Sequence, residues 1–410
     1  MFASATASLL KEHLPHYPTL VMERELSLDI DALVAQQLAP MKLAVVDDRY
    51  TAEAYGERVF RALKGRFPST HITLPSPLAA DDISVQHLRA QTLSADALVA
   101  VGSGTINDLC KYVSHLDRKP YVVFPTAASM NGYVSANASI SQRGHKKTLP
   151  AHMPQAVFCD LSVIAAAPQR LTASGLGDSL ARATAQADWL LSHLLLSTPY
   201  SDVPFALLAP YEPQLMEDAR ALALGDAQAI GQLMRVLLLS GFGMTIAGGS
   251  YPASQGEHMI AHSYEMLEQH AGRNSAKTLL HGEVIGITTQ HMAARQQQLQ
   301  RASPRLCAAD FDGEVMIRSF GSETASSARK AFEGKMALCD ISLPGGISQW
   351  EAIAEKILPV TLSPEVILAT LEKAGAPTHA GALKMNKASL AAATALARYT
   401  RERFTFLDVE

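Results

Sequence analysis

The chain has 410 residues, of which 48% are hydrophobic and 18% are charged, as expected of a soluble globular protein with two or three domains. Its net charge of −4 gives no reason to expect nucleic acid or an anionic membrane as a partner. The four cysteines (Cys110, Cys159, Cys307 and Cys339) lack the paired spacing of a structural zinc site, which favours reduced thiols and a cytoplasmic protein.

Two stretches bear on targeting and membranes. The N-terminal residues lack the basic start and sustained apolar core of a signal peptide. A long uncharged stretch, Val236–Gly256, contains several glycines and Pro252. Such residues favour a buried segment of the protein interior over a membrane span.

Short apolar runs alternate with helical patterns over residues 1–168, which predicts an α/β domain with a parallel sheet. The expected helices are Thr51–Lys64 and Val85–Leu93. The expected strands are Lys42–Val46, Ser69–Leu74, Ala97–Val101, Pro120–Phe124 and Gln155–Asp160.

The strand expected at Ala97–Val101 ends in Gly102-Ser103-Gly104, and a helical pattern follows at once. Glycines allow a sharp turn that presents backbone N–H groups to an anion at a helix N-terminus. This order of elements predicts a phosphate cradle for a nucleotide cofactor. The alternative is a tight turn that binds nothing.

Polar residues follow the other expected strands. Asp47 comes after the strand Lys42–Val46, where a carboxylate can bind the ribose of NAD, although Arg49 weakens that preference over NADP and Asp47 could be a plain loop residue. The loop that begins at Pro125 is rich in hydroxyl and amide groups, which suit a nicotinamide, a pyrophosphate or a sugar alcohol, or it is a connector. Nearby, Lys146 and Lys147 could anchor a substrate phosphate or form a solvated basic turn.

Strand-like runs end near residue 168, and helical segments such as Asp178–Leu196 take over. The pattern predicts an all-helical second domain over 169–410. Residues 301–350 are rich in Gly, Ser and mixed charge, and we expect a surface excursion there.

Three short motifs in this half carry metal-type ligands. Asp178 is expected in the first turn of a helix that opens at Ser174, and Ser254-Gln-Gly-Glu257 predicts a capping box. His258 and His262 then share one helix face, and His281 starts a further helix. One carboxylate and two imidazoles would leave open positions on a divalent cation, as in catalytic zinc sites. Taken singly, Asp178 could be only an N-cap, and the histidines could be structural.

In order along the chain, these segments resemble the sn-glycerol-1-phosphate dehydrogenases, within the superfamily of metal-dependent alcohol and glycerol dehydrogenases and dehydroquinate synthases. The resemblance covers residues from about 40 to 295 and resumes at Arg401–Asp408. It is carried by Gly102–Asp108, Pro125–Gly132, Gly175–Asp178 with Ala187–Trp189, Glu257–His262 and His281–Glu283.

The resemblance implies a dehydroquinate synthase-like fold, in which an α/β dinucleotide-binding domain precedes a helical domain and the active site lies in the cleft between them. It implies a divalent metal held by Asp178, His258 and His281, with zinc expected and nickel or iron as alternatives. It also implies that NAD or NADP and a small phosphorylated ketone bind. A homodimer is the default expectation for a soluble enzyme of this size.

The reaction implied is reversible hydride transfer between NAD(P)H and dihydroxyacetone phosphate, giving sn-glycerol 1-phosphate. Asp108 and His262 are the expected catalytic residues, with His262 relaying the proton. Substrate contacts are expected from Asp108, Asn131, Lys146 and Lys147, and Arg273 or Lys277 could instead hold the phosphate. The expected cofactor contacts are Asp47, Gly102, Ser103, Gly104, Thr105, Asn107, Asp108, Thr126, Ser129 and Ser135.

Two departures and three alternatives stand beside this expectation. Asn131 occupies a position where relatives often carry Asp, and Ser103 one where many have Gly. A polyol dehydrogenase and a non-catalytic nucleotide-binding protein are the alternatives to the phosphate-specific enzyme. A cyclase of the dehydroquinate synthase kind is disfavoured, because Asp178 stands where that enzyme would have Glu.

Overall fold

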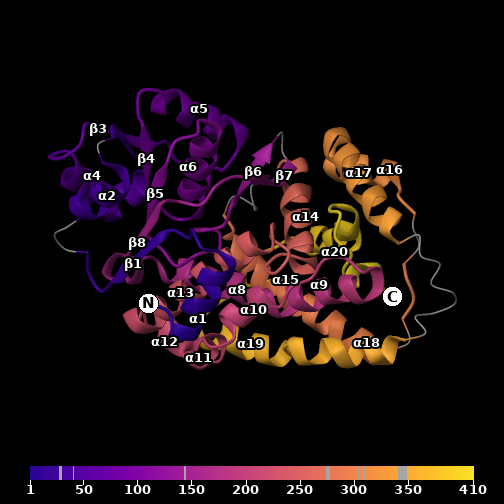
Figure 1. Ribbon diagram of the computed structural model, residues 1–410. Coiled ribbons are helices and arrows are strands. Elements are labelled where there is room, and N and C mark those ends of the chain that lie inside the picture. Colours follow the sequence, from indigo (N-terminus) through magenta and orange to yellow (C-terminus); the bar gives the residue numbers. More distant parts are fainter. Residues whose placement is uncertain are drawn as a thin grey trace. The chain divides into compact units, whose positions relative to one another are not determined.

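The computed structural model describes residues 1–26, 30–39, 41–142, 145–273, 278–302, 304–307, 310–339 and 349–410 (Figure 1). The chain forms two compact units, each built from two segments. Unit 1 comprises Met1–Gly175 and Val203–Gly249, and unit 2 comprises Leu176–Asp202 and Ser250–Glu410. The sequence predicts a single domain boundary after residue 168. In the structure, the segment 203–249 instead packs with the first part of the chain.

Unit 1 contains a six-stranded sheet in the order β1-β8-β5-β4-β2-β3, and every described pair in it is parallel. The four inner strands are almost wholly buried, as expected of a parallel sheet covered on both faces. All five strands expected from the sequence are present. The sequence pattern missed β1, a partly exposed edge strand. The strands are β1 (Thr19–Glu23), β2 (Leu43–Asp48), β3 (Ser69–Leu74), β4 (Ala97–Gly102), β5 (Tyr121–Pro125) and β8 (Ala156–Asp160).

Helices cover both faces of this sheet (Figure 1). On one face, α2 (Ile30–Leu38) and α4 (Glu57–Leu63) share an apolar core with alternate residues of the strands. On the other face, α6 (Gly104–Leu116) packs on β4, β5 and β2, and α5 (Asp82–Thr92) packs beside α6. The short helix α3 (Arg49–Thr51) and a π-helical turn, η1 (Ala52–Gly56), lead from β2 into α4.

A two-stranded antiparallel hairpin replaces much of the expected polar loop. It is made of β6 (Asn137–Gln142) and β7 (His145–Pro150). The prediction of a loop is wrong there, because polar residues mask a strand pattern of period two, in which Ala138 and Ile140 alone are buried in β6.

The remaining helices of unit 1 include a long apolar one. By length and composition, α13 (Ala227–Ile246) could cross a membrane, yet 78% of its apolar window is buried inside the protein. Burial of this helix agrees with the interior role that its glycines predict. The others are α1 (Ser4–His13), α7 (Leu161–Ala165), α10 (Val203–Leu208), α11 (Glu212–Glu217) and α12 (Ala219–Ala223), and α8 (Gln169–Leu180) runs on into unit 2.

The elements assigned to unit 2 in its described part are helical, as the sequence predicts. Its largest core cluster joins residues such as Leu191, Met259, Ile285 and Phe406, which are distant in sequence. The helices are α9 (Arg182–Leu196), α14 (Gly256–His270), α15 (His281–Gln300), α16 (Gly313–Phe320), α17 (Ser322–Leu338), α18 (Trp350–Ile357), α19 (Pro364–Lys373) and α20 (Lys387–Leu396), with 3₁₀ turns η3 (Leu358–Val360), η4 (Ala397–Tyr399) and η5 (Phe406–Asp408).

The described part of residues 301–350 is not a surface excursion. It contains α16 and α17, whose inner faces bury Met316, Phe320 and Phe332. Lys335 is also fully buried, and its Nζ donates to Asp408 Oδ1 at 2.7 Å. The mixed charge of this region belongs to the outer faces of amphipathic helices, apart from this one internal pair.

The C-terminal segment 397–410 is fastened to the core of unit 2 by buried carboxylates. Asp408 accepts from Lys335 and, at 3.1 Å, from Arg398 Nε. Asp188 of α9 accepts from the backbone N–H of Gly256 (2.9 Å) and of Phe406 (3.0 Å), and also from Gln296 Nε2. A single buried carboxylate thus joins α9, the start of α14 and the C-terminal segment.

A close backbone contact sets the end of α8 against the start of α15. A Cβ added at Gly177 would lie 2.1 Å from the carbonyl oxygen of Gly282. Only glycine leaves room for this approach. The contact brings Asp178 next to the first turn of α15.

Gly177→Ala is therefore expected to destabilise the protein by about 1–3 kcal/mol, because the new methyl group must push α8 and α15 apart. Urea unfolding measures the change. Gly65→Ala is the matched control, since a Cβ there meets nothing within 4 Å. Equal stability of the two variants would contradict this account of the contact.

Asp188→Asn is expected to cost about 1–3 kcal/mol of unfolding free energy, because an amide cannot accept from all three donors that face the carboxylate. Thermal or urea unfolding of the purified variant tests this. Asp312→Asn serves as the control: Asp312 is an exposed N-cap of α16, a position where Asn serves as well as Asp. A stable Asp188→Asn variant would show that the three donors find other acceptors.

Candidate functional site

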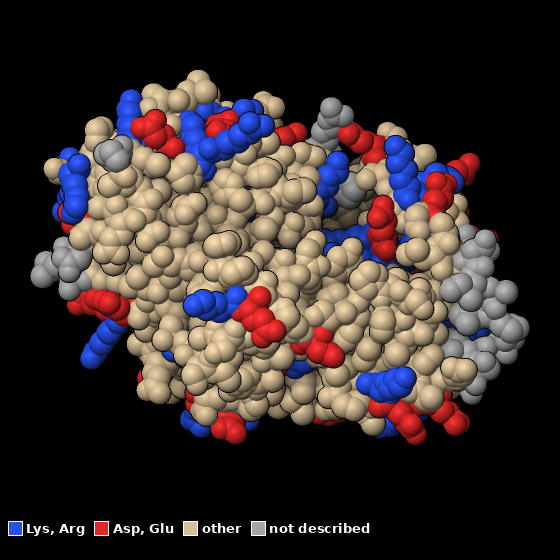
Figure 2. Space-filling view, in the orientation of Figure 1, with Lys and Arg blue, Asp and Glu red and all other residues tan. Residues whose placement is uncertain are grey.

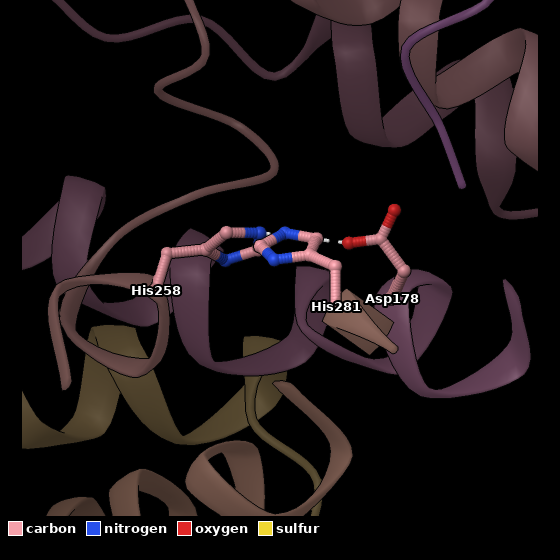
Figure 3. A group of neighbouring side chains, drawn as sticks. All are labelled: Asp178, His258 and His281. Carbon is pink, nitrogen blue, oxygen red and sulfur yellow. Dashed lines mark ion pairs between the residues drawn. The ribbon is translucent and has the colours of Figure 1, made fainter. Parts of the chain in front are cut away.

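Three candidate metal ligands lie together in unit 2 (Figure 3). Asp178 lies near the end of α8, His258 in the first turn of α14, and His281 at the first position of α15. One ligand atom from each lies within 4.8 Å of the others. The Nε2 of His258 is 3.5 Å from Asp178 Oδ1, and Figure 3 shows the three side chains pointing toward one another.

The local structure differs from the expectation in two details. Asp178 does not open a helix, because α8 starts at Gln169 and continues through Gly175 and Gly177. These glycines permit close packing instead of ending the helix: a Cβ at Gly175 would lie 1.9 Å from the carbonyl oxygen of Ala128. The helix expected near Ser254 begins at Gly256, but its N-cap is Gln255, and the Ser254 hydroxyl accepts from an arginine instead.

Glu257 orients the first histidine of the group. Its Oε1 lies 2.8 Å from His258 Nδ1 and also accepts from the N–H of Gln255, while its Oε2 accepts from Thr184 Oγ1 at 2.9 Å. A carboxylate on Nδ1 leaves Nε2 as the nitrogen available to a metal, a common support for metal-binding histidines. Donors of one carboxylate oxygen and two imidazole nitrogens fit a divalent transition metal.

Neighbouring charges shift the pKa values of both His258 and Glu257. Burial alone would lower the pKa of His258, but hydrogen bonds and attraction from Asp178 and Glu257 raise it above its ordinary value. Burial would raise the pKa of Glu257, yet the hydrogen bond and charge of His258 lower it. A cation at this position is thus met by two carboxylates that favour positive charge.

A second possible donor group shares His281 with the first. It adds His262 and Glu265, and Glu265 Oε1 is 3.6 Å from His281 Nδ1. Sequence reasoning missed Glu265, although its spacing from His262 on the same face of α14 is the signal that could have found it. We favour the first group as the metal site, because it is more buried and Glu257 orients its histidine.

His262 contacts an arginine that the sequence analysis did not single out. Arg401 Nη2 lies 2.9 Å from His262 Nδ1. Because a guanidinium only donates, Nδ1 is the acceptor and Nε2 carries the hydrogen of a neutral imidazole. His262 also lies one helical turn from His258, with their ring centroids 5.8 Å apart, as the spacing predicts.

The candidate nucleotide site lies in unit 1, where β4 and β5 end side by side. Gly102 pairs with Pro125, and the N–H of Thr126 donates to the carbonyl of Gly102 at 3.2 Å. A Cβ on Gly102 would come within 2.6 Å of Ile106 Cβ, so glycine is needed for α6 to begin here. The hydroxyl of Ser103, the N-cap of α6, does not cap the helix. This helix N-terminus fits a phosphate group.

Lys111 is a buried residue that the sequence analysis did not weigh. Its Nζ donates to the carbonyl of Gly132, to Ser135 Oγ at 3.2 Å and to the carbonyl of Asn137 at 3.0 Å. Burial lowers the pKa of Lys111 to about 8. The lysine fixes the start of the hairpin against α6, so the Ser135 hydroxyl has a structural partner here.

The other predicted ligand residues of unit 1 are spread over α6, the loop after β5 and the hairpin. Asp108 Oδ2 accepts from the N–H of Ser139 at 3.3 Å, and its Oδ1 lies 3.7 Å from Lys111 Nζ. Gly104, Thr105 and Asn107 lie in α6, Ser129 and Asn131 lie in the loop, and Lys146 and Lys147 lie in β7. Their predicted ligand roles stay predictions.

Asp47 is placed less favourably for ribose than expected. It shares a face of β2 with Leu43 and Val45, is fully buried, and packs against Gly56 of η1. Its oxygens are 2.6 Å from His71 Nε2 and 2.8 Å from Thr73 Oγ1. The side chain therefore points into the protein, and its predicted contact with a cofactor has no support from this geometry.

The sequence offers Arg273 and Lys277 as alternative anchors for the substrate phosphate. Arg273 is paired with Glu268 at 2.7 Å and donates to Ser389 Oγ. Lys277 lies outside the described residues.

Comparison with known proteins places the chain in a family. Residues 21–168 match the family model of the iron-containing alcohol dehydrogenases. A glycerol-1-phosphate dehydrogenase, NAD(P)+, of Pyrococcus furiosus is 33% identical over 68% of this chain and 79% of its own length. An enzyme of the same description from Geobacillus thermodenitrificans is 32% identical over 63% of this chain, although the match spans slightly less than two thirds of that relative, 65%.

Solved structures agree on the fold. Glycerol dehydrogenase from Schizosaccharomyces pombe superposes with a TM-score of 0.56 and 18% identity, over 94% of this chain and 90% of that one. The α/β unit and the helical unit thus have the dehydroquinate synthase-like fold expected from the sequence. With these sequence matches, the chain belongs to the glycerol-1-phosphate dehydrogenase family, among the iron-containing alcohol dehydrogenases.

Proposed function

We propose that this protein is an NAD(P)-dependent, metal-dependent oxidoreductase that transfers hydride between NAD(P)H and dihydroxyacetone phosphate, giving sn-glycerol 1-phosphate. One observation carries the proposal beyond family membership: Asp178, His258 and His281 converge in unit 2 while Glu257 orients His258. A protein that had only kept the fold would have no need of this arrangement.

Asp178, His258 and His281 would hold the metal ion. When bound, a divalent ion supplies Lewis-acid polarisation of the substrate carbonyl and stabilises negative charge on its oxygen. Glu257 keeps Nδ1 of His258 occupied, so Nε2 stays directed at the ion. Zinc remains the expected metal, with nickel or iron as the alternatives.

The backbone around Gly102 and Thr126 would receive the pyrophosphate of the cofactor at the N-terminus of α6. A side chain at position 102 would collide with Ile106, so this turn requires glycine. Lys111 keeps the adjoining loop against α6 without itself being exposed. The choice between NAD and NADP, the homodimer and the cytoplasmic location remain predictions.

His262 is the residue proposed to direct proton delivery through water. Arg401 donates to Nδ1, so the hydrogen resides on Nε2. The Nε2–H can hold a water molecule at the substrate oxygen; that water gives the oxygen its proton, and the hydroxide that remains is protonated from solvent while the imidazole stays neutral. Asp108 remains a predicted catalytic residue, although its carboxylate also accepts from the N–H of Ser139.

The substrate is tested with protein that has been reconstituted separately with zinc, nickel or iron. NADH and NADPH oxidation is followed with dihydroxyacetone phosphate and with dihydroxyacetone. We expect metal-dependent turnover with a kcat/KM at least about 100-fold higher for the phosphate ester, because a phosphate group adds charge-assisted hydrogen bonds. Turnover of the unphosphorylated ketone alone would make the protein a polyol dehydrogenase. No turnover of either would refute the proposed substrate.

His281→Ala is expected to lose bound metal and activity together, since two protein ligands hold a divalent ion far less tightly than three. Metal content after gel filtration, measured by mass spectrometry, is the readout. His270→Ala is the matched control, because His270 is an exposed histidine at the end of α14. An active, metal-free His281→Ala enzyme would refute the metal site.

A further inference from the structure

Arg401 lies beside the candidate metal group, and only two of its N–H donors are engaged by described residues. Its Nη2 donates to His262 Nδ1 at 2.9 Å, and its Nη1 donates to Ser254 Oγ at 2.9 Å. A guanidinium has five N–H donors, so these two bonds leave three. Both partners are neutral groups, and no carboxylate of the described residues lies within 4.0 Å of Arg401 in an ion pair.

Arg403 brings a second positive charge to the same place. It donates to the carbonyls of Ser250 and Ser254 and, at 2.9 Å, to Ser250 Oγ, and its Cζ lies 4.5 Å from the ring centre of Tyr251. These partners are also uncharged, so Arg403 is held rigidly without being neutralised. Burial and the charge of Arg403 lower the pKa of Arg401 to about 9, which still leaves Arg401 charged at neutral pH.

The local charges do not balance without an anion. The carboxylates of Asp178, Glu257 and Glu265 bring three negative charges, against four positive charges from a divalent metal ion and two guanidinium groups, which leaves an excess of positive charge. Glu257 is the carboxylate that acts on both arginines through space, yet it is bonded to His258 and Thr184. Like charges that are partly buried and unpaired are costly. A phosphate monoester carries a charge of about −1.5 to −2 at pH 7, which is enough to offset this excess.

We propose that Arg401, held in place with Arg403, binds the phosphate group of the substrate. The proposal rests on the function proposed above and assigns the phosphate subsite within unit 2. Arg401 would supply planar, paired donors to the phosphate oxygens while it holds His262 by Nδ1. Arg403 is a positioning residue that adds charge and fixes the segment. The phosphate would then lie next to His262, whose ring centroid is 5.8 Å from that of the proposed metal ligand His258.

The basic residues expected from the sequence are less suitable. Arg273 is exposed and already neutralised by Glu268 at 2.7 Å. Lys146 and Lys147 lie on the hairpin of unit 1, with partly exposed side chains. In the face drawn in Figure 2, basic and acidic side chains are interspersed, so no broad basic area offers another anchor there. Arg401 and Arg403, whose hydrogen-bond partners are uncharged, are therefore better suited to bind an anion.

Arg401→Gln tests the assignment in the metal-loaded enzyme. We expect kcat/KM for dihydroxyacetone phosphate to fall about 10- to 100-fold, mostly through KM, because charge-assisted hydrogen bonds are lost. Metal content should change less than about 3-fold, because Arg401 is not one of the proposed metal ligands. Independently of turnover, inorganic phosphate should raise the melting temperature of the wild type, and Arg401→Gln should lose most of that rise.

Arg318→Gln is the matched control, an exposed arginine of α16 in the same unit, and should behave as the wild type in both assays. An Arg401→Gln enzyme with unchanged KM and an unchanged response to phosphate would overturn the proposal. So would loss of phosphate binding in Arg273→Gln or Lys277→Gln with Arg401→Gln unaffected. If the wild type fails to reduce dihydroxyacetone phosphate, the proposed function fails, while the melting experiment still decides whether Arg401 binds phosphate.

Arg401→Lys covers the case in which the glutamine variant does not fold. Lysine keeps the charge but presents no planar pair of donors. We expect phosphate affinity at least about 3-fold weaker than in the wild type, with metal content retained. Unchanged affinity in this variant would overturn the proposed paired contact.

Discussion

The buried carboxylate of Asp188 is the constraint on which the rest of unit 2 depends. It accepts hydrogen bonds from the first residue of α14, from Phe406 in the C-terminal segment and from Gln296 of α15. The rotation of α14 that aims His258 and His262 is therefore set by the same group that fixes the segment carrying Arg401. His258 and Arg401, more than a hundred residues apart in sequence, are thus positioned by segments that bind the same carboxyl group.

This arrangement places two buried carboxylates, Asp188 and Glu257, near each other. Burial, and next the charge of Glu257, raise the pKa of Asp188 to about 8, against three hydrogen bonds that favour its ionised form. Glu257 faces the opposite balance, because His258 lowers its pKa. Asp188 therefore binds backbone N–H groups, whereas Glu257 binds the histidine of the candidate metal site. Environment, not residue type, separates their roles.

Much of this could be predicted from the sequence, and the failures have physical causes. The inner strands and the histidine pair were predictable, because buried parallel strands and helical spacing leave strong patterns in the sequence. The helix through Asp178 was misplaced, because glycines that allow contact with Ala128 and Gly282 look like helix breakers. Arg401 and Lys111 depend on partners remote in sequence, which no local pattern reveals. Asp47 looked exposed by its place at a strand end, but Gly56 leaves space that buries it.

Because each unit is built from two separate segments, the two units cannot complete their folding at the same time during synthesis. Unit 1 has all its residues once Gly249 is made, whereas α9 lies in the chain long before its partners α15 and the C-terminal segment exist. At ribosomal rates of about 5–20 residues per second, α9 waits for roughly 10–40 s before Phe406 can reach Asp188. During that interval its apolar residues, such as Ala187 and Leu191, lack their final neighbours. The nascent chain therefore has a defined window in which chaperones or neighbouring chains compete for this helix.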